Sequence, residues 1–121
     1  MRMVLLRHEL PDGTGHFDWM IETENAAEGL VSFRVWDRID QPGLGVFRAL
    51  RVADHRSAYL DFQGPVSAGR GSVSRVATGI VESIEDNGTS IRVQGSFPGL
   101  DATWTGRRID GDWAFAVLEP E

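Results

Sequence analysis

Turn signals recur about every eight to twelve residues along this chain, and this spacing restricts its possible folds more than any other feature. The signals are Pro11-Asp12-Gly13, Gly29, Pro42-Gly43, Gly64-Pro65, Gly69 to Gly71, Asn87-Gly88, Pro98-Gly99 and Asp110-Gly111. No segment keeps a helical apolar period over three turns, although residues 23–28 could form a short acidic turn of helix. Short strands joined by tight turns are therefore expected.

Apolar and polar side chains alternate with a period of two between these turns, which is the pattern of a strand with one buried face. The alternation runs through residues 16–21, 31–36 and 46–53, and it places Arg48 and Arg51 on opposite faces. Two hairpins are predicted, one turning at Asn87-Gly88 and one at Asp110-Gly111, because these pairs accept positive φ angles. We expect an all-β fold, a compact, closed or nearly closed antiparallel β-barrel of about six to eight strands.

Length and composition narrow the class of protein. The 121 residues suit a single domain over residues 1–121, and 41% hydrophobic with 25% charged residues is typical of globular proteins. The first apolar run, Met3 to Leu6, is too short for a signal peptide or a membrane span, so a cytoplasmic protein without membrane association is expected. The net charge of −6 opposes nonspecific coating of nucleic acid but allows a small pocket for one phosphate.

Three histidines stand beside carboxylates, and they are the first candidates for chemistry. The chain has no cysteine, so any metal must be held by histidine and carboxylate. His16 and Asp18 lie two apart on one strand face, and His8 at the end of the first strand could add a third ligand. Such a set suits manganese, iron or zinc. The alternative is a histidine hydrogen-bonded to an aspartate at a strand end.

A second group of candidates follows the strand at residues 46–53. His55 and the only tyrosine, Tyr59, are four residues apart, with Arg48 and Arg51 upstream. These side chains could bind a phosphate, with Arg48 as its cation, and protonate a leaving oxygen. The alternative for Tyr59 is an ordinary packing aromatic with its hydroxyl at the barrel rim.

The ordered motifs of the chain resemble one family, the 3′-phosphoesterase module of the bacterial end-joining, ATP-dependent DNA ligase, ligase D. The likeness covers nearly the whole chain. The residues that carry it are His8-Glu9, His16-Phe17-Asp18, Asp54-His55, Tyr59, Asp61-Phe62, Gly64, Gly69-Arg70-Gly71-Ser72-Val73, Gly106, Arg107-Arg108 and Gly111-Asp112-Trp113.

The resemblance implies a function in DNA repair. It implies a β-barrel with metal ligands at His8, His16 and Asp18, and with phosphate-binding residues at His55 and Tyr59. Its implied cofactor is a divalent metal, manganese first and zinc second, and its implied partner is a nucleic-acid 3′ end. The implied reaction removes a 3′-terminal ribonucleoside and then the 3′-phosphate. No protein partner is indicated.

The chain departs from the family pattern at two places, and the first of them, together with the acidic net charge, leads to the main alternative hypothesis. Met20 replaces the arginine two residues beyond the metal-binding aspartate, and Pro11 to Gly15 lengthen the gap between the first two histidines. Arg34, Arg38 or Arg48 could replace that arginine in space. The main alternative is a catalytically impaired barrel that binds a phosphorylated end or a small anion. The third hypothesis is a ligand-binding barrel without metal.

Overall fold

The computed structural model of the chain describes residues 1–25 and 29–120, which are all-β apart from one short 3-10 helix. The elements are β1 (Arg2–Glu9), β2 (Gly15–Ile21), β3 (Leu30–Val35), β4 (Val46–His55), η2 (Ser57–Leu60), β5 (Gly64–Pro65), β6 (Ser72–Asp86), β7 (Ser90–Phe97), β8 (Leu100–Ile109) and β9 (Asp112–Leu118). The expected helical turn over 23–28 lies partly outside the described residues, and residues 23–25 are not helical.

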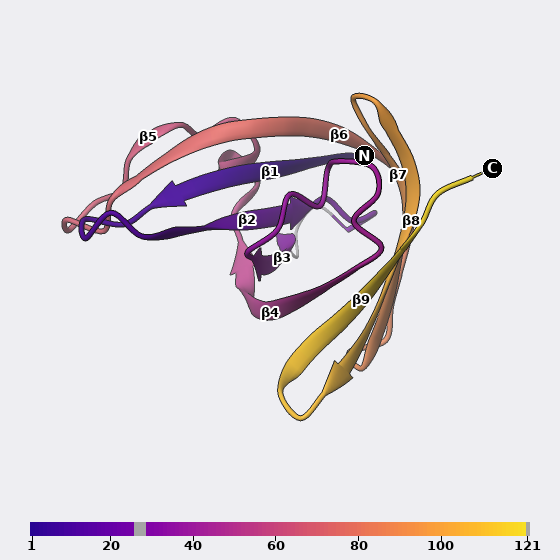
Figure 1. The fold of residues 1–121 in the computed structure, drawn as a ribbon. Coiled ribbons are helices and arrows are strands. Elements are labelled where there is room, and N and C mark those ends of the chain that lie inside the picture. The colour runs from indigo at the N-terminus through magenta and orange to yellow at the C-terminus, as the bar shows by residue number, and fades with distance from the viewer. Residues whose placement is uncertain (26–28, 121) are drawn as a thin grey trace.

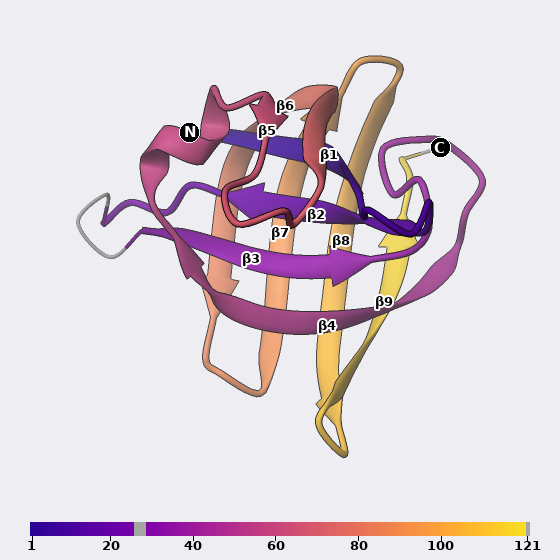
Figure 2. The same ribbon diagram turned by 90° about the vertical axis from the view of Figure 1, so that its left-hand side faces the viewer.

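Eight of the strands form a closed antiparallel barrel, as the sequence predicts. Their order is β1-β2-β3-β4-β9-β8-β7-β6, and pairing of β6 with β1 closes the ring. The long strand β6 joins the two halves, since its first part pairs with β1 and its second with β7 (Figure 1). In Figure 2 the strands β1–β4 cross steeply in front of β7–β9. The short strand β5 adds to the side of β6.

The predicted hairpins form where the sequence places them. Asp110 and Gly111 join β8 to β9 with φ angles of 50° and 89°, and the Asn87-Gly88 turn joins β6 to β7. Within the described residues, no helix has the length and apolar content needed to cross a membrane.

The barrel interior is filled by aromatic side chains. Trp19 contacts Trp104 and Phe115 with ring centroids 5.7 and 5.5 Å apart, and Phe33 lies 5.4 Å from Trp113. Each ring that leaves water in this way contributes on the order of 2 kcal/mol to folding. The interior is therefore a packed core that leaves no place for a site, and any site must lie outside it.

A second apolar cluster lies on the outer face of β1–β3. Successive strand residues face opposite sides, so Met20 points outward between the inward-facing Trp19 and Ile21. The cluster consists of Val4, Leu6, Met20, Leu30, Leu60 and Val73. Residues 56–71, called here the covering segment, supply Leu60 and pack Tyr59, Phe62 and Val66 against the cluster. Figure 2 shows η2, β5 and the intervening loops in front of β1 and β2.

Candidate metal centre

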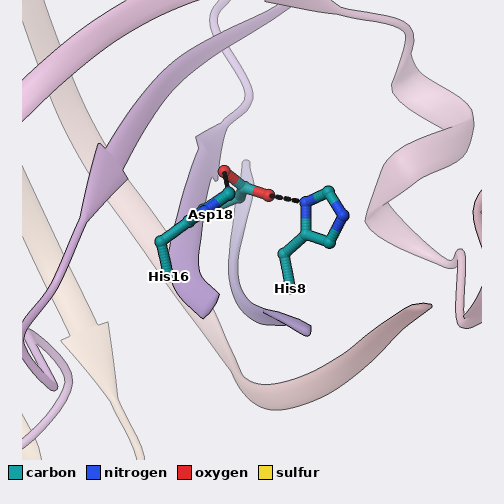
Figure 3. Close-up of side chains that lie close together, drawn as sticks. All are labelled: His8, His16 and Asp18. Carbon is teal, nitrogen blue, oxygen red and sulfur yellow. Dashed lines mark ion pairs between the residues drawn. The ribbon is translucent and has the colours of Figure 1, made fainter. Parts of the chain in front are cut away.

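The β1–β2 hairpin brings the three predicted metal ligands together on the outer face of the barrel. His8 and His16 are direct cross-strand partners, and Asp18 follows His16 on the same face of β2. His16 Nε2 lies 3.2 Å from Asp18 Oδ1, and His8 Nδ1 lies 3.7 Å from Asp18 Oδ2 (Figure 3). One candidate ligand atom from each residue lies within 4.8 Å of the others.

The nitrogen atoms of His8 and His16 that face Asp18 are both suited to bind a metal at this cluster. His8 Nε2 lies 2.7 Å from the carbonyl oxygen of Arg70, to which it donates its proton, so the lone pair of His8 is on Nδ1 beside Asp18. His16 Nε2 is buried and makes no hydrogen bond with any residue that the structure describes. Two imidazole nitrogens and one carboxylate oxygen match the donor set that manganese or zinc accepts. The cluster could therefore hold a divalent metal.

Burial keeps His16 in the neutral form that metal binding requires. The pKa of His16 is lowered from 6.5, mainly by burial, and the charge of Arg34 lowers it further. The carboxylate of Asp18 acts in the opposite direction and raises this pKa. Because the lowering effects are larger, His16 is unprotonated at neutral pH.

A cavity of about 330 Å³ opens beside the cluster and contains the predicted phosphate-binding residues. His55 at the end of β4 and Tyr59 in η2 both line it, with ring centroids 5.1 Å apart in a T-shaped arrangement. The remaining lining residues are Leu6, His8, Asp18, Met20, Arg34, Val52, Ala53, Asp54, Val66, Arg70 and Val73. The structure thus places His8, Asp18, His55 and Tyr59 around one cavity.

The hydrogen bond with Ser32 determines which ring nitrogen of His55 carries the proton. The Ser32 hydroxyl is fully buried and donates its only proton to the carbonyl of Leu30 at 3.0 Å. It therefore accepts the bond from His55 Nδ1 at 2.9 Å, which leaves the lone pair of His55 on Nε2. Burial lowers the pKa of His55 from 6.5, and its effect outweighs that of the Asp18 and Asp54 carboxylates, which raise this pKa. His55 is consequently a neutral base.

The arginines of β3 and β4 lie at three different places in the barrel. Arg34 is the direct cross-strand partner of Asp18 and lines the cavity of the cluster. Arg48, the predicted phosphate residue, lines a separate hollow of about 460 Å³ with Val46 and Arg107. Arg51 points inward, with its guanidinium 5.6 Å from the Phe33 ring centroid, so Arg48 and Arg51 do face opposite sides.

The environment of Met20 explains why no charged side chain stands there. Met20 is 2% exposed and belongs to the second apolar cluster with Leu60 and Val73. An arginine at this position would have to bury its charge among apolar side chains beneath the covering segment.

The covering segment closes tightly over the end of β1. Gly71 has a φ angle of +92°, and a Cβ there would overlap the carbonyl of Glu9. This close approach places the Arg70 carbonyl on His8, which is the contact that sets the tautomer of that ligand.

Ser32 and Arg34 also belong to the site. Arg34 is predicted from the sequence only as one of three arginines that could replace the missing one, and Ser32 is not predicted. Both stand on the polar side of the alternating pattern in residues 31–36, which is the signal that could have indicated them. Their place beside Asp18 and His55 depends on the pairing of β3 with β2 and β4.

The chain matches no protein-family model, and no curated protein shows a significantly similar sequence.

Proposed function

We propose that this protein is a metal-dependent phosphoesterase that acts on nucleic-acid 3′ ends, removing a 3′-ribonucleoside and a 3′-phosphate. The observation that carries the proposal is the shared position of two sets of residues. The His8, His16 and Asp18 cluster adjoins the cavity that contains His55 and Tyr59. These five side chains are the ones that the resemblance to the ligase D phosphoesterase module singles out.

The proposed chemistry divides the work between the cluster and the cavity. A divalent metal, most simply manganese, would polarise a phosphate oxygen and stabilise the charge that develops on it. His55, neutral with its lone pair on Nε2, accepts a proton from the attacking water. The Tyr59 hydroxyl is a donor that serves the leaving oxygen.

The form of the cavity supports a chain end as substrate. Its volume of about 330 Å³ suits a terminal phosphate with part of a sugar, and the covering segment contributes Tyr59, Val66 and Arg70 to its lining. The protein's net charge of −6 favours a substrate held at one phosphate over a duplex bound along its backbone. The nucleic-acid end remains the substrate that the family resemblance favours.

Turnover of a defined primer-template tests the proposal. The substrate bears a single 3′-ribonucleotide or a 3′-phosphate, and the reaction is followed with and without added Mn²⁺. We expect Mn²⁺-dependent release of the ribonucleoside and of phosphate, and loss of both in His16→Ala and His55→Ala.

Bound manganese without turnover would contradict the phosphoesterase proposal and favour the alternative of a binding module for a phosphorylated end or a small anion. Full activity in His16→Ala would show that the metal cluster takes no part in the reaction.

A further inference from the structure

Arg34 is a partly buried cation whose hydrogen-bonding capacity is unused within the described part of the chain. It points outward from β3, between its partners Asp18 on β2 and Leu50 on β4. Its Nε is buried and has no hydrogen-bond partner, and its guanidinium forms no ion pair with a described residue. Arg34 also lines the cavity, so a ligand there that accepts from its guanidinium gains a charge-assisted hydrogen bond.

The neighbouring carboxylate does not satisfy Arg34. Asp18 is its cross-strand partner, but the Asp18 oxygens lie beside the imidazoles of His16 and His8, at 3.2 and 3.7 Å. The alternative acceptor in the cavity lining is Asp54, which forms no ion pair with Arg34 either. The positive charge of Arg34 is thus available to a molecule that enters the cavity.

The other cations near the site do not offer the same free group. Arg70 lines the cavity, but its Nε and Nη2 donate to the backbone and side chain of Ser67 at 2.9 and 3.0 Å. Arg48 lines the separate hollow on β4 and β9. Met20, at the position of the family arginine, is apolar and buried.

We propose that Arg34 binds an oxyanion of a phosphate group in the cavity, and that it does so in place of the arginine missing at position 20. This inference rests on the proposed function for the identity of the anion. The fixed charges of the cavity lining cancel, with Asp18 and Asp54 against Arg34 and Arg70, so carboxylates do not exclude an anion. The planar guanidinium suits a tetrahedral oxyanion, to which it can donate two parallel hydrogen bonds.

Calorimetric titration with inorganic phosphate tests the role of Arg34 without relying on turnover. Phosphate is titrated into the wild type, Arg34→Met, Arg34→Lys, Arg48→Met and Arg92→Met, once in EDTA and once with saturating Mn²⁺. Arg92 is an exposed arginine of β7 outside the cavity and serves as the matched control. Midpoints of thermal unfolding establish that each variant is folded.

We expect phosphate to bind Arg34→Met at least about tenfold more weakly than the wild type in both conditions, because a charge-assisted hydrogen bond is lost. Arg34→Lys, which keeps the charge without the fork, falls between the two, and it still reports if Arg34→Met does not fold. Arg92→Met binds phosphate as the wild type does. The affinity for Mn²⁺ in the absence of phosphate changes less than about threefold in all variants, since Arg34 is not in the cluster.

Unchanged phosphate affinity in Arg34→Met would overturn the inference, as would a loss found in Arg48→Met instead. A wild type that binds no phosphate in either condition would also overturn it. Arg34-dependent phosphate binding without turnover of the primer-template would leave the anion site standing and remove the proposed function. Turnover of the primer-template together with phosphate binding that does not depend on Arg34 would support the proposed function and overturn the anion site at Arg34.

Discussion

The imidazoles of His8 and His55 each have one nitrogen committed to a neighbour, and this determines what the other nitrogen can do. The Arg70 carbonyl binds Nε2 of His8, and the Ser32 hydroxyl binds Nδ1 of His55. One lone pair is therefore directed to the cluster and the other belongs to a free Nε2. Residues distant in sequence thus set the tautomers of both imidazoles.

At this scale, acid should destabilise the protein between pH 7 and pH 5. Burial lowers the pKa of His16 and His55 from 6.5, so just below pH 6.5 the unfolded chain binds more protons than the folded one. Their contribution to stability is fully present above about pH 6.5 and is lost as the pH falls toward their lowered values. Urea unfolding in EDTA at a series of pH values measures this slope.

The matched variant for this experiment is His55→Gln, which cannot titrate and should show a shallower loss of stability on acidification. A wild type that becomes more stable than His55→Gln as the pH falls from 7 to 5 would contradict the account, because it would mean that the folded state favours protonated His55.

The sequence identifies the metal ligands more completely than their neighbours for a physical reason. His16 and Asp18 share a strand face by period alone, and the hairpin that follows His8 brings the third ligand across. Ser32 and Arg34 reach the site because β3 pairs with β2 in one particular register. The sequence that connects these two strands contains no two-residue turn motif that would determine this register. Arg48 lines a separate hollow instead of the cavity. The face of the strand on which a residue stands does not determine how far that residue lies from Asp18.

At the level of elements, the covering segment supplies one wall of the cavity on the outer face of the sheet. It supplies apolar side chains to the second cluster and the Arg70 carbonyl to His8. Sequence turn signals predict a bend at Gly69 to Gly71, but its contact with the end of β1 depends on the tertiary fold.

Gly71→Ala should weaken metal binding as well as stability. The added Cβ overlaps the Glu9 carbonyl and displaces the Arg70 carbonyl from His8, so we expect Mn²⁺ affinity to fall about tenfold. Gly88→Ala is the matched control, because Gly88 has a similar φ of +87° with open space around it. That control should lose about 1 to 3 kcal/mol of stability and keep its Mn²⁺ affinity. Equal Mn²⁺ affinity in the two variants would contradict the role given to the covering segment.

Restoring the family arginine with Met20→Arg should destabilise the protein. Met20 is buried in the second apolar cluster, so an arginine there would take its charge out of water among apolar side chains, and we expect a loss of at least about 3 kcal/mol. Met20→Leu, which preserves volume and polarity, should cost less than about 1.5 kcal/mol. Urea unfolding measures both. Unchanged stability in Met20→Arg would contradict this prediction, because it would show that the apolar cluster accommodates a guanidinium.

At the scale of the whole molecule, the barrel provides rigidity and the site lies outside its core. Aromatic packing fills the interior, while Arg51 covers Phe33 and binds Asp86 through two hydrogen bonds of 3.0 and 2.7 Å. The all-β barrel is predictable because turn spacing and alternation are local signals that repeat along the chain. The cavity is less predictable, since it needs the barrel, the register of β3 and the covering segment together.

The most direct test of the account is a Mn²⁺ titration of the purified protein, in which electron paramagnetic resonance detects the free ion. The account predicts one bound ion per chain, with binding weakened at least about a hundredfold in His16→Ala and Asp18→Asn, since each removes one of three protein ligands. Asp54→Asn, a carboxylate of the same cavity outside the cluster, should bind as the wild type does. A wild type that leaves all Mn²⁺ free, or a His16→Ala that binds it equally well, would contradict the central claim.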